Sequence, residues 1–247
     1  MRTPPMVQRG VILAAGNGDR FHNGSPRSKL LIPLAGMPLI LRTIWTSARA
    51  GLQELDLVVG YDAGSVRSVI EAGAPAGVEV HFHYNDRWHE ENGISALVAA
   101  PHVGDERFAL LMGDHVFDWR VLRKLLLTPA RLGESLLAID RGLISPARAA
   151  EATKVRLSGD RIVAIGKNLD PFDAVDTGLF VCDTPLFTAL QESCAAGDTS
   201  LSGGIGRLAA RGLVRGIDTG HRAWYDIDTV DDFVEAQLAL EERSTNT

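Results

Sequence analysis

A short apolar run at residues 11–15 stops at a Gly-x-Gly turn formed by residues 16–18. The β-branched residues of this run are typical of a strand that is buried on both faces of a sheet. Glycines after such a strand let the backbone approach a ligand and direct N–H groups at phosphate oxygens. Because Arg20 and Lys29 add positive charge nearby, the stretch predicts a clamp for a nucleoside triphosphate. The alternative is a glycine turn that only joins a strand to a helix.

Two commoner phosphate loops are excluded. A dinucleotide-binding turn needs a third small residue where Phe21 stands, and an acidic residue about 20 positions later for the ribose. A P-loop needs Gly-Lys-Ser/Thr, but Gly24 is followed by Ser25 and Pro26. The clamp therefore belongs to another class of nucleotide-binding protein.

The first half of the chain alternates apolar strands with amphipathic helices. Strands are predicted at residues 11–15, 56–59, 78–84, 108–112 and 135–140, and helices at 38–50, 65–72, 94–100 and 118–127. Ser65 is the expected cap of the second helix. This order predicts a Rossmann-like, mostly parallel sheet that is flanked by helices and joined by right-handed crossovers.

The second half has a different pattern. Residues 153–157 and 161–165 alternate around a Ser-Gly-Asp turn, which predicts a hairpin. A short strand at 224–229 carries Asp226 and Asp228 on one face. Further elements are predicted as a strand at 179–182 and helices at 185–195, 201–210 and 230–242.

Size and charge limit the protein class. At 247 residues and 45% hydrophobic, the chain fits one domain, with a nucleotide-binding half at about 10–140 and an acceptor-binding half at about 141–247. A net charge of −6 without a basic run argues against nucleic-acid binding. No stretch reaches the roughly 18–20 apolar residues of a membrane span, so no membrane insertion is expected. Two cysteines without metal or disulfide spacing fit the cytoplasm.

Asp114 follows the buried strand 108–112, where a carboxylate needs a partner. It either caps the next helix or binds a cation. Asp226 or Asp228 can meet it across the site, although Asp228 can also cap the last helix. Two carboxylates with phosphate oxygens and water suit Mg²⁺, and His115 is placed to position Asp114.

Lys154, Lys167 and Asp176 are predicted to line the acceptor side. The alternative is ordinary solvated charge on strand faces, and for Lys167 taken alone this alternative is preferred.

Several stretches together carry a family resemblance. The run Leu-Ala-Ala-Gly-Asn-Gly-Asp-Arg with a following lysine, a strand ending in Gly-Asp and a late Asp-Ile-Asp-Thr resemble the sugar-phosphate nucleotidyltransferases. Residues 112–116, 152–156, 165–167 and 175–180 are similar to the inositol-1-phosphate cytidylyltransferase branch, a relative of the phosphocholine cytidylyltransferases. The likeness covers residues 11–239. It implies a nucleotide-diphospho-sugar transferase (GT-A-like) fold with a small acceptor-side hairpin region.

The resemblance implies Mg²⁺-dependent transfer of CMP from CTP to inositol 1-phosphate, giving CDP-inositol and pyrophosphate. A nucleotidyltransferase for phosphocholine, a related phospho-alcohol or a sugar 1-phosphate is the alternative. A domain that senses nucleotides without chemistry is an alternative of another class.

Site roles follow from the same resemblance. The catalytic residues implied are Arg20, Lys29, Asp114 and Lys154. The nucleotide would contact Leu13, Ala14, Ala15, Gly16, Asn17, Gly18, Asp19, Arg20, Lys29, Asn92, Gly93, Ser95 and Asp114. The acceptor would contact His115, Lys154, Lys167, Asp176, Thr177 and Gly178. Magnesium would be held by Asp114 with Asp228, or with Asp226 in its place.

The chain departs from the family pattern twice. Relatives usually place proline before the clamp lysine, whereas here Ser28 precedes Lys29, so Arg27 is a competitor for that role. The best-known members are fused to a membrane-embedded transferase that has no counterpart here, so a separate membrane transferase is expected to receive the product. The oligomeric state is left open.

Overall fold

The computed structural model describes residues 7–18, 21, 27–142 and 151–245. Its strands are β1 (Arg9–Ala14), β2 (Pro33–Leu34), β3 (Met37–Pro38), β4 (Glu54–Val59), β5 (Glu79–Tyr84), β6 (Phe108–Met112), β7 (His115–Phe117), β8 (Ser135–Asp140), β9 (Lys154–Ser158), β10 (Arg161–Gly166), β11 (Ala174–Cys182), β12 (Val214–Asp218) and β13 (Trp224–Asp226). Its helices are η1 (Lys29–Leu31, 3-10), α2 (Leu39–Ala50), α3 (Ala63–Gly73), α4 (Asn92–Val103), α5 (Trp119–Leu127), α7 (Pro185–Ala195), α8 (Leu201–Ala210) and α9 (Val230–Thr245).

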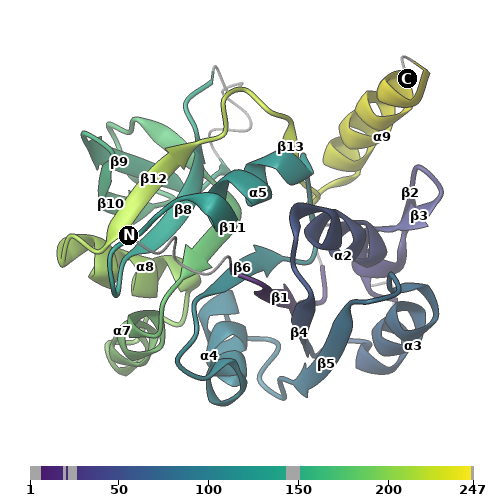
Figure 1. The fold of residues 1–247 in the computed structure, drawn as a ribbon, viewed down its shortest axis with the longest axis horizontal. Coiled ribbons are helices and arrows are strands. Elements are labelled where there is room, and N and C mark those ends of the chain that lie inside the picture. The colour runs from purple at the N-terminus through teal and green to yellow at the C-terminus, as the bar shows by residue number, and fades with distance from the viewer. Residues whose placement is uncertain (1–6, 19–20, 22–26, 143–150, 246–247) are drawn as a thin grey trace.

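Within the described residues, one sheet runs in the order β5-β4-β1-β6-β11-β8-β12-β10-β9 (Figure 1). The strands β5, β4, β1 and β6 are parallel, which confirms the predicted alternation of strands and helices. The mixed α/β sheet flanked by helices is confirmed as well. It is less parallel than expected, because β11 runs antiparallel to both of its neighbours β6 and β8.

The second half closes on itself. β9 and β10 form the predicted hairpin, with Gly159 at a φ of 67° in its turn. β9 also pairs with β11, so β11, β8, β12, β10 and β9 make a ring of strands. The strand β12 was not predicted, and it enters the ring in parallel beside β8.

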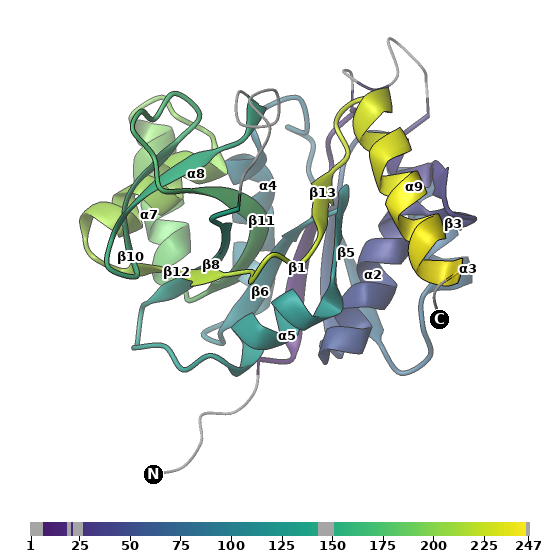
Figure 2. The same ribbon diagram turned by 90° about the horizontal axis from the view of Figure 1, so that it is seen from above.

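Alternate side chains of the sheet feed two cores. On β1, Ile12 and Ala14 join the core beneath α2, α3 and α5, whereas Val11 and Leu13 join the core beneath α4, α7 and α8. Figure 2 shows α7 and α8 with the second half of the sheet, and α2 and α9 on the opposite side of the molecule.

The predicted cap of one helix is wrong, and the last helix has a capping pair of its own. The helix α3 begins at Ala63, so Ser65 lies inside its first turn, and the preceding Asp62 makes no side-chain cap bond. At α9, Thr229 and Asp232 form a reciprocal capping pair, with Asp232 N donating to Thr229 Oγ1 and Thr229 N donating to Asp232 Oδ2. The side chain of Asp228, which precedes this pair, lies 2.9 Å from Lys29 Nζ.

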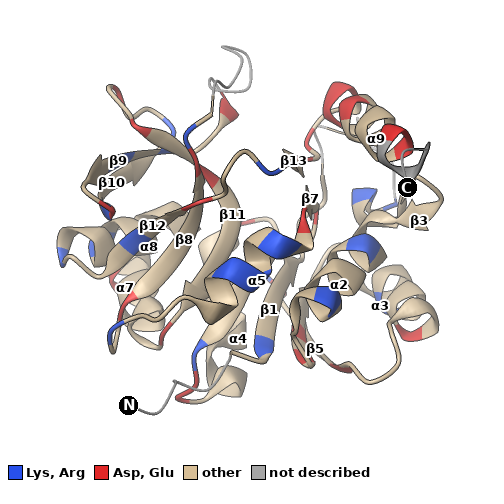
Figure 3. Ribbon diagram, turned by 45° about the horizontal axis from the view of Figure 1, so that its top comes forward, with Lys and Arg blue, Asp and Glu red and all other residues tan. Residues whose placement is uncertain are grey.

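Charged residues are unevenly distributed over the elements. Figure 3 shows acidic residues on α9 and basic residues on α2 and α5. In the part of the chain that the structure describes, no helix combines the length and the apolarity that a bilayer span requires.

Candidate functional site

The carboxyl ends of the parallel strands meet at one edge of the sheet. Leu13 of β1 is in register with Met112 of β6, and Gly113 N donates to Leu13 O at 2.9 Å. The clamp at residues 15–18 and Asp114 therefore leave the sheet side by side. Open α/β sheets bind their ligands at such an edge.

The clamp has the glycine geometry that a phosphate-binding turn needs. A Cβ on Gly16 would meet no atom of the described residues within 4 Å, which fits close approach of a ligand to its backbone. Gly18 has a φ of 68°, and a Cβ there would lie 2.8 Å from the Lys29 side chain. The predicted residues Asp19 and Arg20 lie outside the described residues. The remaining clamp residues are Leu13, Ala14 and Ala15, which are buried, and Asn17, which is half-buried.

Lys29 is buried at the same edge. Its Nζ lies 2.9 Å from Asp114 Oδ2 and 2.9 Å from Asp228 Oδ1, and it donates to Ile227 O at 2.8 Å. Arg27, the competitor for the clamp role, is exposed. Burial alone would lower the pKa of Lys29, but Asp114 and Asp228 together raise it above its usual value. The ammonium is therefore a fixed positive charge between two carboxylates.

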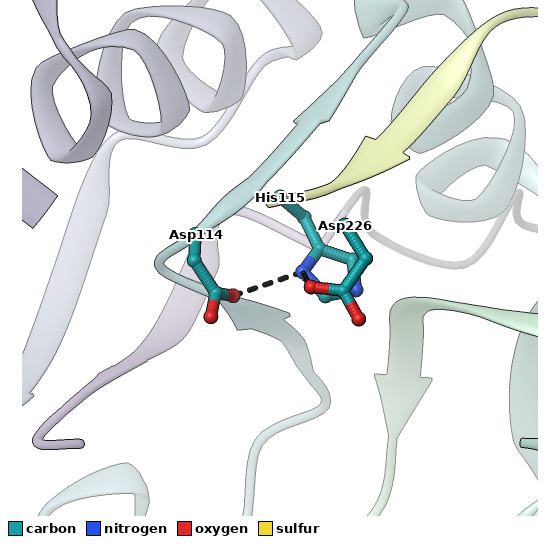
Figure 4. A group of neighbouring side chains, drawn as sticks. All are labelled: Asp114, His115 and Asp226. Atoms are coloured by element: carbon teal, nitrogen blue, oxygen red, sulfur yellow. Dashed lines mark hydrogen bonds and ion pairs between the residues drawn. The ribbon is translucent and has the colours of Figure 1, made fainter. Parts of the chain in front are cut away.

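Asp114, His115 and Asp226 form an acidic group beside Lys29 (Figure 4). The pairing of β7 with β13 sets Asp226 opposite His115. His115 Nδ1 lies 2.9 Å from Asp114 Oδ1 and 3.6 Å from Asp226 Oδ1. One ligand atom from each of these residues lies within 4.8 Å of the others, so the group can hold a metal ion. Asp228 lies beyond the end of β13, where it contacts Lys29.

The charges in this group are strongly coupled. Burial lowers the pKa of His115, but Asp226 and Asp114 outweigh it and raise this pKa to about 9. Burial works against ionisation of Asp114, yet Lys29 and His115 hold its pKa well below the usual range. Burial and the neighbouring carboxylates raise the pKa of Asp226 to about 6. Lys29 and His115 therefore place positive charge beside the carboxylates of Asp114 and Asp226.

β11 closes on the acidic group from the acceptor half. A bulge between Asp176 and Phe180 breaks its pairing with β8. Gly178 N donates to Asp176 Oδ1 at 2.7 Å, and a Cβ on Gly178 would lie 2.5 Å from His115 Nε2. Burial raises the pKa of Asp176 to about 6. Thr177 is buried, and its hydroxyl donates to the carbonyl oxygen of residue 138.

The two predicted acceptor lysines differ in their surroundings. Lys154 pairs with Val175, next to Asp176, so its backbone adjoins the bulge. Its Nζ donates to Lys167 O at 2.8 Å and lies 5.6 Å from the Phe172 ring centre. Lys167 is exposed, and its carbonyl supports Lys154.

The first residues of α4 are held by contacts with α8 and with Asn85. Asn92 Oδ1 accepts from Leu201 N, which ties α4 to α8, and Gly93 is buried against the backbone before α8. Ser95 is buried and accepts from Asn85 Nδ2 at 3.0 Å. Asn85 and Trp88 belong to the polar loop at residues 85–93, which the sequence predicts as a second site stretch because it follows the strand 78–84. Gly60 and Tyr61 were not predicted, although they follow the predicted strand 56–59.

A separate cavity lies between α2 and α5. It has a volume of about 590 Å³ and is lined in part by Trp45, Arg49, Trp119 and Arg120. None of the predicted site residues in the described ranges lines this cavity, so it is distinct from the Asp114 edge.

Comparisons with known proteins agree with this geometry. The family described as "MobA-like NTP transferase domain" matches residues 10–156. The "Bifunctional IPC transferase and DIPP synthase" of Rubrobacter xylanophilus is 36% identical over 226 residues, which cover 90% of this chain and 49% of that protein. The chain spans about half the length of the curated relatives it matches.

Solved structures share the fold across nearly the whole chain. The inositol-1-phosphate CTP transferase from T. maritima has a TM-score of 0.82 and 25% identity, over 96% of this chain and 98% of that one. A UDP-glucose pyrophosphorylase complexed with UDP-glucose has a TM-score of 0.81 and 16% identity, over 96% of this chain and 100% of that one. The predicted nucleotide-diphospho-sugar transferase fold is therefore confirmed.

Proposed function

The chain belongs to the MobA-like NTP transferases, and from this premise we propose that it transfers CMP from CTP to inositol 1-phosphate. The products are CDP-inositol and pyrophosphate. The relatives named IPC transferase and the T. maritima structure support this choice of nucleotide and acceptor. The observation that carries the proposal is the position of Lys29 Nζ, 2.9 Å from both Asp114 and Asp228, beside the glycine clamp.

The clamp half binds and orients the triphosphate. Backbone N–H groups of residues 15–18, together with Arg20 and Lys29, would stabilise the triphosphate and the departing pyrophosphate. Asn92, Gly93 and Ser95 would form the base end of the site with the loop before α4. The hydrogen bonds of Asn92 to α8 and of Ser95 to Asn85 would hold this end of the site in position.

Asp114, with Asp226 or Asp228, would hold Mg²⁺. Carboxylate oxygens are the protein ligands that this ion prefers, so the donor set fits. When bound, the ion would neutralise phosphate charge and polarise the α-phosphate. His115 lies within hydrogen-bond distance of Asp114 and would keep that carboxylate ionised and oriented.

The acceptor half brings in the nucleophile. A phosphate monoester carries about −1.5 to −2 charge near neutral pH, so it attacks without a strong general base. Repulsion from the triphosphate is the obstacle, and basic side chains must offset it. Lys154 would hold the acceptor phosphate, while His115, Lys167 and the stretch from Asp176 to Gly178 would shape the site around the alcohol.

The whole chain would act as one nucleotidyltransferase domain in the cytoplasm. The sheet that continues through both halves supports a single domain. CDP-inositol would then be consumed by a membrane transferase that uses the activated alcohol.

A substrate matrix tests the proposal. Pyrophosphate release is measured for CTP, UTP, dTTP and ATP against inositol 1-phosphate, phosphocholine and glucose 1-phosphate. Rapid release is expected only when CTP, Mg²⁺ and inositol 1-phosphate are present together. Turnover with phosphocholine, or only with UTP or dTTP and glucose 1-phosphate, would move the protein to another branch. Nucleotide binding without any product would identify a sensing domain.

A further inference from the structure

Two aromatic side chains lie on the same edge as the clamp, two strands away from it. Ala14 of β1, Val59 of β4 and Tyr84 of β5 are register neighbours, so the residues that follow them share one edge. Strands about 4.8 Å apart put β5 about 10 Å from β1. Tyr61 follows β4 and Trp88 follows β5, and both return toward the end of β1.

Close packing fixes Trp88 against the clamp. A Cβ on Gly60 would lie 2.4 Å from Trp88 Cβ and 2.9 Å from Ala15 O, so only glycine leaves room for this contact. Trp88 also packs against the buried cluster that contains Ala15. Tyr61 N donates to Ala15 O at 2.9 Å, and the Tyr61 and Trp88 rings lie 5.3 Å apart at a tilt of 59°. Both aromatic residues are thus anchored to the strand end that carries the clamp.

The two directions away from Lys29 and Asp114 differ in chemistry. Toward β11 the edge carries the half-buried carboxylates of Asp176 and Asp226. Toward β5 it carries the half-buried rings of Tyr61 and Trp88. A nucleobase is planar and uncharged, and it stacks on aromatic rings. The base therefore fits the β5 direction, which leaves the β11 direction to the acceptor.

We propose that Trp88, held in place by Tyr61 and Gly60, is the surface on which the pyrimidine base of the bound nucleotide stacks. The inference deepens the proposed function and rests on it, because the base is that of CTP. Trp88 would contribute to nucleotide affinity through the base alone and would leave phosphate recognition to Lys29 and the clamp.

Binding measured without acceptor tests this inference. Titration calorimetry gives the Kd of CTP and of inorganic tripolyphosphate for the whole chain and for Trp88→Leu and Trp88→Phe. Leucine keeps an apolar contact with Ala15 but has no π-face, so the Kd of CTP should rise about tenfold. The Kd of tripolyphosphate should stay unchanged, and phenylalanine should retain most of the CTP affinity. Trp45→Leu is the matched control, because Trp45 is exposed and lines the cavity between α2 and α5.

An unchanged CTP affinity in Trp88→Leu would overturn the inference. Equal losses for CTP and tripolyphosphate would overturn it too, because Trp88 would then support the clamp rather than the base. If the leucine variant does not fold, tryptophan fluorescence decides the matter. CTP, but not tripolyphosphate, should quench the wild-type signal, and Trp88→Phe should lose that quench; an undiminished quench contradicts the inference. A protein that binds CTP through Trp88 yet makes no CDP-inositol would overturn the proposed function alone.

Discussion

The two halves of the sheet deliver side chains to the site in different ways. β1, β4, β5 and β6 are parallel, and their contribution comes from loops at their carboxyl ends. The ring of strands in the second half contributes from inside a strand, through the bulge of β11 at Gly178. Loops can adjust to the shape of a long, flexible nucleotide. A bulge inside a closed ring of strands instead holds a few residues in one position. Under the proposed function, the loops of the first half would receive the nucleotide and the bulge of the second half would position the acceptor.

The largest expected effect comes from removing the carboxylate where the halves meet. Asp114→Asn should lower turnover about a thousandfold, because the side chain loses the charge that pairs with Lys29 and would hold the metal ion. Pyrophosphate release measures the change. Asp105→Asn, an exposed aspartate before β6, is the control and should keep full activity. Near-normal turnover in Asp114→Asn would show that the Asp114 carboxylate, at the ends of the parallel strands, takes no part in the reaction.

Lys29→Met tests whether the ion pairs of Lys29 with Asp114 and Asp228 stabilise the fold. The substitution leaves Asp114 and Asp228 without the ammonium that they share, so the free energy of unfolding should fall by about 3 kcal/mol. Denaturant titration measures the free energy of unfolding. Lys124→Met is the control, since that lysine is on an exposed surface and donates only to Asp218 O. Equal small changes in both variants would show that the Lys29 contacts do not stabilise the fold.

Lys154→Met tests whether the second half binds the acceptor without affecting the nucleotide. It should raise the KM for inositol 1-phosphate about 30-fold through the loss of one charge-assisted phosphate contact, with the Kd of CTP unchanged. Lys167→Met should have a much smaller effect, because only its carbonyl supports Lys154. A loss of CTP binding in Lys154→Met would contradict the division of labour between the halves.

Gly178→Ala tests the bulge itself. The new Cβ would lie 2.5 Å from His115 Nε2 at a φ of 73°, so the free energy of unfolding should fall by about 2 kcal/mol. Gly159→Ala has a similar φ of 67° but an open surrounding, and should cost about 1 kcal/mol. Thermal unfolding of the two variants separates the clash from the backbone strain. The same loss in both would show that β11 does not press on His115.

The smallest effect is a pH dependence at the junction of the halves. The pKa of His115 rises from 6.5 to about 9 on folding, so its stabilising contribution is complete below pH 6.5 and is lost as the pH rises through about 9. In EDTA, the stability difference between wild type and His115→Gln should shrink as the pH rises across this window. His89→Gln, at an exposed position, is the control. A difference that stays constant would contradict the charge balance described for His115.

The parallel half was largely predictable from the sequence because its signals are local. A buried strand, a glycine turn and a helix are each encoded within a few residues, and Asp114 follows its strand directly. The register that joins these elements is the usual one for parallel strands. Local sequence signals are therefore enough to predict which residues meet at the clamp edge.

In the second half the sequence predicted the hairpin, the helices at 185–195, 201–210 and 230–242 and the strands at 179–182 and 224–229, but not the closure of the strands into a ring. The ring depends on β12 lying beside β8 and on β9 pairing with β11, and such long-range pairings leave no local pattern. The positions of Asp226 and Asp228 also depend on a long-range pairing, that of β13 with β7. Alternation predicted Asp226 and Asp228 on one face, but the strand ends at Asp226, which sets Asp226 beside His115 and sends Asp228 to Lys29.

Anomalous scattering from crystals soaked with CTP and Mn²⁺ in place of Mg²⁺ tests the central claim most directly. We expect the Mn²⁺ peak in contact with the Asp114 carboxylate, with the triphosphate lying over residues 13–29. A Mn²⁺ peak and a nucleotide located away from this edge, for example in the cavity between α2 and α5, would contradict the account.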